Sequence, residues 1–299
     1  MKKNGKYRFS IVIPSYNEEN FLSSCLTSLK NQDFKDNFEI IVVDNNSTDN
    51  TYLIANRMGV KVISETQPGV CFARQAGSEV AQGEIIISTD ADTIFKKNWL
   101  SNIDKTFKKD PNIIAVSGPC RYIDGPWWGK SYTYFLFTAN YLYSLLFKHP
   151  FYISATNVAF YKSYFEGYDL TSMQGGDELH ILNNLKKHGK IKFLYNNPSL
   201  TSGRRLKQGL TYNFFVTFLF YYLGAYYLNK LFKRQLIGAA PSFRLNRPKT
   251  VNPRFSLGLT TIIVTIAIVA TAISPVRNFI SDNIKETKLR IDAIVRSIS

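Results

Sequence analysis

Three short runs near the start of the chain are almost uniformly apolar, and they predict buried strands. They are residues 9–14, 38–44 and 83–90, each rich in Ile and Val. A strand with one face in water would alternate apolar and polar residues, so we expect parallel strands that are covered on both faces. A shorter run at residues 60–64 predicts one more strand of the same kind.

Helical periodicity fills the gaps between these runs. Residues 18–31 place apolar side chains at helical spacing, and residues 49–58 and 70–81 indicate two further helices. Strands that alternate with helices predict an α/β fold, with a sheet flanked by helices.

Polar clusters follow three of the predicted strands, at residues 15–18, 44–47 and 90–92. Ligands of α/β folds bind outside the carboxyl ends of the strands. We therefore expect the three polar loops to converge on one edge of the sheet and to form the functional site there.

The chain changes character after residue 126, where three long uncharged runs appear. Residues 131–147 fit either a buried helix or a helix lying in a membrane interface, where Tyr is common. Residues 256–274 are aliphatic, and as a helix they would extend about 28 Å, close to the thickness of a bilayer. We expect a single membrane span there.

The run at residues 211–229 contains five tyrosines, which suits a helix in the membrane plane. Residues 230–254 carry seven basic residues and no acidic one, so the positive-inside rule places this loop in the cytoplasm. The favoured arrangement is thus an in-plane helix, one span and an outside tail. A two-span hairpin is the alternative.

Net charge is concentrated in the C-terminal third. Of the formal net charge of +15, residues 1–200 account for +3 and residues 201–299 for +12. Basic residues beside apolar runs indicate an anionic membrane surface rather than a nucleic acid. The polar, basic residues 1–8 give no reason to expect a cleavable signal.

Several function classes have no support in the sequence. The three cysteines and three histidines are scattered, which argues against a disulfide scaffold and against a zinc-protease motif. Neither a P-loop motif nor a G-x-G-x-x-G motif is present, so an NTPase and a dinucleotide oxidoreductase are both disfavoured.

The candidate chemistry begins with Asp90 and Asp92 at the end of a predicted strand. Two carboxylates in this spacing suit Mg²⁺ or Mn²⁺ shared with a diphosphate, although a surface pair would look the same. Asp44 ends another strand and could bind a nucleobase or ribose, or instead cap a helix. Arg74 could bind phosphate or form a surface ion pair.

The order of these motifs resembles the family 2 glycosyltransferases, which have the GT-A fold. The matching text is residues 11–19, 41–49, 69–77 and 88–92, and the resemblance covers roughly residues 8–205. It implies an α/β fold with a GT-A-type nucleotide-binding sheet. It further implies that Pro14, Tyr16, Glu18 and Asp44 bind the nucleoside, that Asp90 lies near the ribose and the metal, and that Asp92 binds the metal.

The family's acceptor half ends in a Glu-Asp pair followed by Leu and Gly at fixed offsets. Placing Leu185 and Gly189 on those offsets aligns Asp177 and Glu178 with the pair in reversed order. Either carboxylate could act as the base of an inverting transfer, with Asp177 slightly favoured; a first-turn acid complementing the helix dipole is the structural alternative.

Arg204 and Arg205 lie in a segment that resembles the family's arginine-bearing loop over the donor diphosphate. One of them could instead meet anionic lipid headgroups. The Gln-x-x-Arg-Trp motif of the processive synthases is absent, so transfer of a single sugar is favoured over polymerisation.

The resulting domain prediction has four parts. Residues 1–205 form the GT-A domain, divided into a nucleotide-sugar half (8–125) and an acceptor half (126–205). Residues 206–255 form a basic membrane-interface segment, 256–274 a transmembrane helix and 275–299 a tail.

The function that these patterns predict is a membrane-anchored inverting glycosyltransferase of the hexosyltransferase type at the cytoplasmic face. Its partners would be a nucleotide-diphosphate sugar, Mg²⁺ or Mn²⁺, a saccharide or lipid-linked acceptor and membrane lipids. A metal-dependent nucleotidyltransferase and a non-catalytic nucleotide-binding membrane protein are the alternatives.

Overall fold

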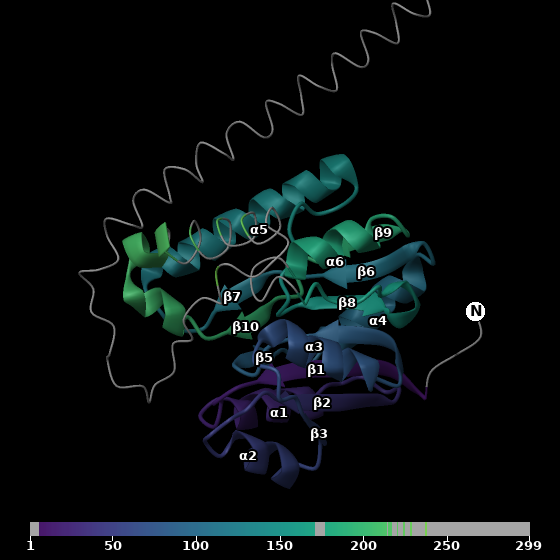
Figure 1. Ribbon diagram of the computed structural model, residues 1–299. Coiled ribbons are helices and arrows are strands. Elements are labelled where there is room, and N and C mark those ends of the chain that lie inside the picture. The colour runs from purple at the N-terminus through teal and green to yellow at the C-terminus, as the bar shows by residue number, and fades with distance from the viewer. Residues whose placement is uncertain are drawn as a thin grey trace, which may run out of the picture.

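The computed structural model describes residues 6–170 and 177–213, together with 215, 216 and the single positions 220, 224, 228 and 237. The predicted span at 256–274 and most of the run at 211–229 lie outside the described residues. The described chain forms two β-sheets with helices around them (Figure 1).

The larger sheet has seven strands in the order β3-β2-β1-β4-β8-β6-β9. Its strands are β1 (Tyr7–Ser15), β2 (Phe38–Asp44), β3 (Lys61–Ser64), β4 (Gly83–Ser88), β6 (Ile113–Ser117), β8 (Val158–Tyr161) and β9 (Lys190–Phe193). The four strands expected from the apolar runs are therefore confirmed, with ends that differ by at most two residues.

Strand direction also follows the prediction in the first half of the chain. β1 pairs in parallel with both β2 and β4, and β2 pairs in parallel with β3. The apolar side chains of the first three predicted strands are buried in one continuous core, as expected for strands covered on both faces. β8 is the exception, because it runs antiparallel to both of its neighbours, β4 and β6.

Helices connect the strands and cover the sheet. They are α1 (Leu22–Lys30), α2 (Thr51–Arg57), α3 (Val70–Glu79), α4 (Trp99–Lys109), α5 (Trp127–Phe147) and α6 (Asp177–Leu185). The helix expected at residues 18–31 begins only at Leu22, because the carbonyl of Glu18 accepts hydrogen bonds from the amides of Phe21 and Leu22 in a preceding turn.

A smaller sheet of three strands, in the order β5-β10-β7, adjoins the large one. Its strands are β5 (Thr93–Phe95), β7 (Cys120–Tyr122) and β10 (Ser199–Thr201). β10 is the central strand and brings the chain near residue 200 back beside residue 93, so that segments distant in sequence meet at the carboxyl end of β4.

The uncharged run at residues 131–147 lies within α5, which packs against β7 at the far end of the molecule from α2 (Figure 1). Only a narrow face of α5 is buried, so the buried-helix interpretation of this run is wrong for most of its side chains. Among the described residues, none of the helices has both the length and the apolar character that crossing a bilayer requires.

Candidate functional site

The expected convergence of polar loops occurs at the carboxyl edge of the large sheet. Ser15 and Asp44 are paired at the ends of the parallel strands β1 and β2, and β4, which ends at Ser88 opposite Val12 of β1, leads into Asp90 two residues later. Register alone therefore gathers the motifs at residues 15–18, 44–47 and 90–92.

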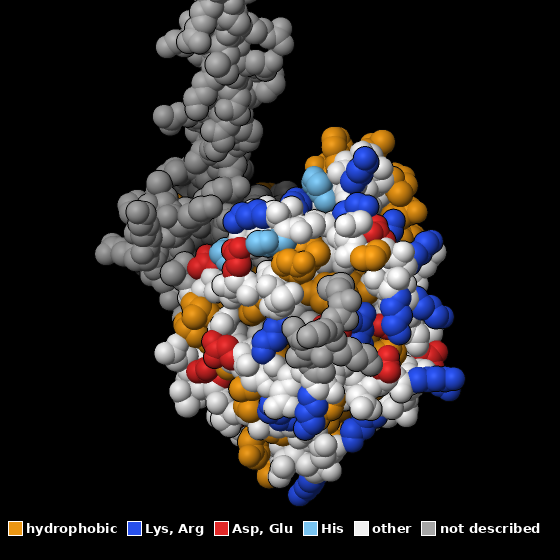
Figure 2. Space-filling view, turned by 90° about the vertical axis from the view of Figure 1, so that its right-hand side faces the viewer, with side chains coloured by type: hydrophobic (Ala, Val, Ile, Leu, Met, Phe, Trp, Pro, Cys, Tyr) orange, Lys and Arg blue, Asp and Glu red, His pale blue; other side chains and the backbone are white. Residues whose placement is uncertain are grey.

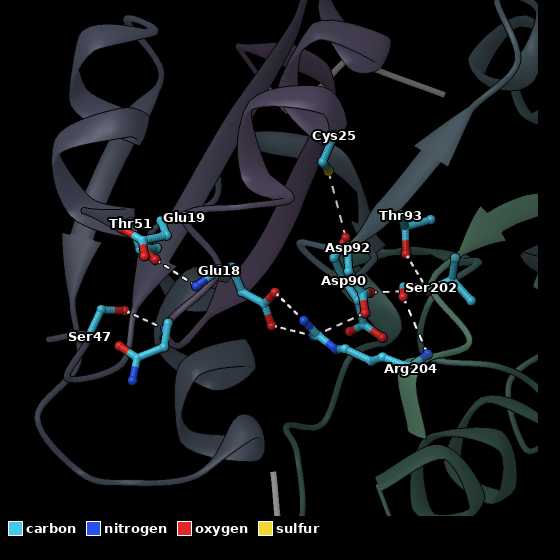
Figure 3. A network of polar contacts seen from close by, with 12 residues as sticks. Glu18, Glu19, Cys25, Ser47, Thr51, Asp90, Asp92, Thr93, Ser202 and Arg204 are labelled. Atoms are coloured by element: carbon cyan, nitrogen blue, oxygen red, sulfur yellow. Dashed lines mark hydrogen bonds and ion pairs between the residues drawn. The ribbon is translucent and has the colours of Figure 1, made fainter. Parts of the chain in front are cut away.

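Arg204 lies at the centre of this edge, in a short 3₁₀ helix, η2 (Arg204–Gln208) (Figure 3). Its guanidinium donates two hydrogen bonds to the Glu18 carboxylate, at 2.8 and 2.6 Å. One of its nitrogens, Nη2, also lies 3.0 Å from Oδ2 of Asp92. The charged end of Arg204 lies over the ring of Phe21, 4.8 Å from its centroid. A bidentate pair with a cation–π contact holds the planar group in one orientation.

The smaller sheet explains how Arg204 reaches residues that precede it by more than 100 positions. Thr201 in β10 pairs with Thr93 in β5, one residue after Asp92. The Thr201 hydroxyl donates to Oδ1 of Asp92 at 3.0 Å, and the amide of Ser202 donates to the Asp92 carbonyl at 3.2 Å. The chain then turns into η2 directly over the carboxylates.

Asp124 fixes that turn from the other side. Its Oδ1 accepts hydrogen bonds from the Gly203 amide at 2.5 Å and from the Ser202 hydroxyl at 3.2 Å. A Cβ on Gly203 would lie 2.4 Å from the Asp124 carbonyl oxygen, so this close approach requires glycine.

The second cation of the site, Arg74, is buried in α3 and not on the surface. Its Nη2 lies 2.7 Å from Oδ1 of Asp90. The surface-ion-pair interpretation of Arg74 is therefore wrong: its buried guanidinium pairs with the half-buried Asp90, one aspartate of the D-x-D motif. Two arginines thus face three carboxylates, those of Glu18, Asp90 and Asp92.

Burial and this surplus negative charge both act on Asp92. Its pKa is raised to about 6, chiefly by burial and also by the charges of Asp90 and Glu18, against the opposing effects of Arg204 and Thr201. An ionised Asp92 is therefore stabilised by an additional cation more than an ordinary surface aspartate would be.

Asp44 has an acceptor atom that the protein itself leaves unused. Its Oδ1 is buried and has no hydrogen-bond partner within the described part of the chain. The alternative role as a helix cap is wrong, because α2 begins at Thr51 and Asn50 is its N-cap residue. A buried acceptor without a partner is costly, so a donor group of a ligand is the expected occupant.

The carboxylates fit a hard divalent cation that shares its ligands with a phosphate. In residues 6–170 and 177–213, no group of three or more His, Cys, Asp or Glu side chains is arranged to hold a metal. Asp90 and Asp92 can supply only one or two oxygens, which matches Mg²⁺ or Mn²⁺ sites completed by substrate phosphates and water. Asp92 would have to exchange its contact with Arg204 for the ion.

The other site residues predicted from the sequence lie at the end of β1, in η2 and in the first turn of α6. Pro14 and Tyr16 are half-buried at the end of β1, and Arg205 follows Arg204 in η2. Asp177 and Glu178 occupy the first turn of α6, where Glu178 is half-buried. Gly189 follows α6 where a Cβ would meet the Ile114 side chain at 2.8 Å.

Three residues of the site were missed from the sequence: Phe21, Asp124 and Thr201. Phe21 falls among the apolar positions of the helix predicted at residues 18–31. Asp124 and Thr201 act through contacts with residues 78 or more positions away. Neither carries a local spacing signal that could have identified it.

Comparison with known proteins gives the family. A family model described as "Glycosyl transferase family 2" matches residues 10–169, which include Glu18, Asp44, Arg74, Asp90 and Asp92. Asp177, Glu178 and Arg204 lie beyond the matched residues.

Two curated relatives are similar over about a third of this chain. The Staphylococcus aureus poly(ribitol-phosphate) beta-N-acetylglucosaminyltransferase TarS is 34% identical over 102 residues, covering 32% of this chain and 18% of its own. The poly(ribitol-phosphate) beta-glucosyltransferase of Bacillus spizizenii is 41% identical over 122 residues, covering 37% and 19%. The aligned part thus spans less than a fifth of either relative.

Solved structures show the same fold at low identity. The mannosyltransferase PcManGT from Pyrobaculum calidifontis, in complex with GDP-Man and Mn²⁺, superimposes with a TM-score of 0.56 at 19% identity, covering 89% of this chain and 75% of that one. TarS 1–349 in complex with UDP gives 0.53 at 20% identity, covering 65% and 60%. The fold is GT-A-like, and because the family model matches more than half of the sequence, the chain belongs to glycosyl transferase family 2.

Proposed function

We propose that this glycosyltransferase moves a single sugar, with inversion, from a nucleotide-diphosphate sugar to a hydroxyl or phosphate acceptor. The observation that carries the proposal is the cluster in which Arg204 pairs with Glu18 and Asp92 while Arg74 pairs with Asp90. Its carboxylates and arginines are the groups that bind a diphosphate and its divalent cation.

Asp90 and Asp92 are the residues that would hold Mg²⁺ or Mn²⁺ here. When bound, such an ion stabilises the negative charge that develops on a departing diphosphate. The complex of PcManGT with GDP-Man and Mn²⁺ supports the same pairing of nucleotide sugar and ion for this chain.

The protein's own residues supply binding and orientation. The unpartnered Oδ1 of Asp44 accepts a hydrogen bond from the base or ribose of the donor, beside Pro14 and Tyr16. Arg204 exchanges its contact with Asp92 for the donor diphosphate while Glu18 keeps its guanidinium oriented. Arg205, next in η2, is the second candidate for the diphosphate.

The acceptor is activated from the first turn of α6. Inversion needs one base opposite the leaving diphosphate, and Asp177 or Glu178 would take the proton from the acceptor hydroxyl. The aliphatic run at 256–274 and the basic loop before it support a location at the cytoplasmic face of the cell membrane, with a lipid-linked acceptor.

The metal role is tested with Asp92→Asn, which keeps an acceptor for Thr201. Release of nucleoside diphosphate in Mn²⁺ should fall roughly 100-fold, since the charge stabilisation by a metal amounts to several kcal/mol. Asp110→Asn changes a half-exposed carboxylate at the C-terminal end of α4, outside the cluster, and should leave turnover intact. Unchanged turnover in Asp92→Asn would remove this residue from the ligand set.

The base is tested by comparing Asp177→Asn with Glu178→Gln. The variant that loses the base should lose turnover by about 10²- to 10⁴-fold while binding of the donor is unchanged. Donor binding is measured by thermal shift against UDP-, GDP- and dTDP-sugars with Mn²⁺, which also identifies the base of the nucleotide. NMR of the product's anomeric proton decides inversion, and retention would refute that part of the proposal.

A further inference from the structure

The outward face of α5 has an unusual composition for a surface helix. Its buried side chains are Gly129, Thr133, Phe137 and Asn140, which lie along one side of the helix. At 3.6 residues per turn, the opposite side carries large exposed apolar side chains where a soluble helix carries charge. These are Trp127, Tyr132, Tyr134, Phe135, Leu142, Leu145 and Leu146.

These side chains are exposed to a degree that has a cost in water. Trp127 is 80% exposed, Phe135 78% and Leu146 77%. A contiguous apolar patch of this kind on a protein surface marks an interaction site. We define the α5 face as these seven side chains.

The charges around the α5 face are basic. Lys130 and Lys148 are exposed at its two ends, and no acidic residue occurs in the sequence between Asp124 and Glu166. Figure 2 shows hydrophobic and basic side chains together at the top of the molecule, over the C-terminal end of α5.

The segment after β10 extends this basic, apolar surface at the N-terminal end of the helix. Leu206 of η2 packs on Gly129, where a Cβ would lie 2.2 Å from it. This contact places Arg205 and the exposed Lys207 beside the start of α5. Leu210, which follows, is 58% exposed.

We propose that the α5 face docks in the plane of an anionic lipid bilayer, with its apolar side chains in the headgroup region and its flanking lysines at the lipid phosphates. Trp and Tyr favour this depth, and cations near the surface are attracted to anionic lipid. A second copy of the chain is disfavoured as the occupant, because a symmetric contact would bring the same lysines against each other.

The docking adds to the membrane location proposed above a contact made by the catalytic domain itself. It also gives that contact a place relative to the site, because η2 carries Arg204 at its first position and packs on α5 through Leu206. An acceptor held in the bilayer would then lie next to the segment that binds the donor diphosphate.

The test uses the full chain with an environment-sensitive NBD fluorophore on a single introduced cysteine. The native Cys25, Cys71 and Cys120 are buried, and burial raises the pKa of Cys120 to about 12, so they react poorly with the label. Leu142→Cys places the label on the α5 face. Asn56→Cys places it on exposed α2, at the opposite end of the molecule (Figure 1).

Vesicles of phosphatidylcholine with phosphatidylglycerol should shift the emission of the label at 142 to the blue and raise its intensity. Pure phosphatidylcholine should do so much less, and the label at 56 should not respond. Phe135→Glu with Leu146→Glu should abolish the response at 142, because both side chains are exposed and the fold tolerates the change. The matched control, Tyr52→Glu with Leu53→Glu on α2, should leave the response of the label at 142 unchanged.

Three results would overturn the proposal. One is a label at 142 that stays in water while the chain floats with anionic vesicles. Another is an equal response to neutral vesicles. The third is emission already blue-shifted before lipid is added, which would mean that a second copy or another segment of the chain covers the face. Release of nucleoside diphosphate, measured without vesicles on the same labelled chain, reports separately on the proposed function.

Discussion

Asp92 shows how one buried carboxylate can serve binding at the expense of stability. Its side chain is only 12% exposed and its pKa is raised to about 6, first by burial and then by Asp90 and Glu18. The folded apo-protein therefore binds a proton at Asp92 more tightly than the unfolded chain does. Stability from this group is present at low pH and is lost as pH rises toward 6.

The comparison of wild type with Asp92→Asn isolates this effect, because asparagine does not titrate. In EDTA, the free energy of unfolding of the wild type should fall relative to the variant between about pH 4 and pH 6, by at most about 3 kcal/mol. Urea denaturation at several pH values measures it. A difference that stays constant over this range would mean that the pKa of Asp92 is not raised.

At the scale of elements, the strands that could be predicted are those whose own sequence shows that both of their faces are buried. The runs at β1, β2 and β4 are uniformly apolar because helices cover both faces of the sheet, and this pattern is visible in the sequence. The motifs at their carboxyl ends, with Asp44, Asp90 and Asp92, could be placed together for the same reason.

The later strands could not be predicted in this way. β5, β7 and β10 have three residues each, too few for any periodicity. The pairing of these strands depends on tertiary contacts. The positions of Thr201 in β10 and of Arg204 just after it depend on the same contacts. The sequence indicated Arg204 as a diphosphate ligand, but its bidentate pair with Glu18, 186 residues away, follows from the register of β10 against β5.

Gly77 lies in α3 where this helix packs closely against the parallel strands β1 and β2. A Cβ at this position would lie 2.4 Å from Cγ1 of Val12 and 2.9 Å from Cγ2 of Val43. Both valines are stiff, β-branched and fully buried in adjacent strands, so neither can move away at low cost. We expect Gly77→Ala to lower the free energy of unfolding by about 1–3 kcal/mol net, despite the higher helix propensity of alanine.

Glu79→Ala, on the exposed side of the same helix, is the matched control and should change stability by less than about 0.5 kcal/mol. Thermal or urea denaturation compares the two. If Gly77→Ala proved stabilising, α3 would have to sit farther from β1 and β2 than the structure places it.

At the scale of the whole molecule, the two sheets depend on each other through one buried amide. Asn157, at the start of β8, accepts a hydrogen bond from the indole nitrogen of Trp99 at 3.1 Å. Its amide nitrogen donates to the carbonyls of Pro119 and Asn197, at 3.0 and 2.9 Å. Pro119 precedes β7 and Asn197 precedes β10, so this side chain holds both strands where they leave the large sheet.

Removal of this amide should therefore affect more than its own surroundings. Asn157→Ala leaves the indole N–H of Trp99 without its acceptor and the Asn197 carbonyl without the donor that Asn157 supplies, at about 1–3 kcal/mol each, while the Pro119 carbonyl keeps its bond from the Ser199 amide. We expect a total loss of about 3–5 kcal/mol. Asn112→Ala, in an exposed turn, is the control and should cost less than about 0.5 kcal/mol. Urea denaturation measures both variants.

Because β10 carries Thr201 and leads into Arg204, Asn157→Ala should also weaken donor binding under conditions where the variant is still folded. A loss of stability with unchanged donor affinity would show that Arg204 is positioned by Asp124 and Glu18 alone, without the join between the sheets.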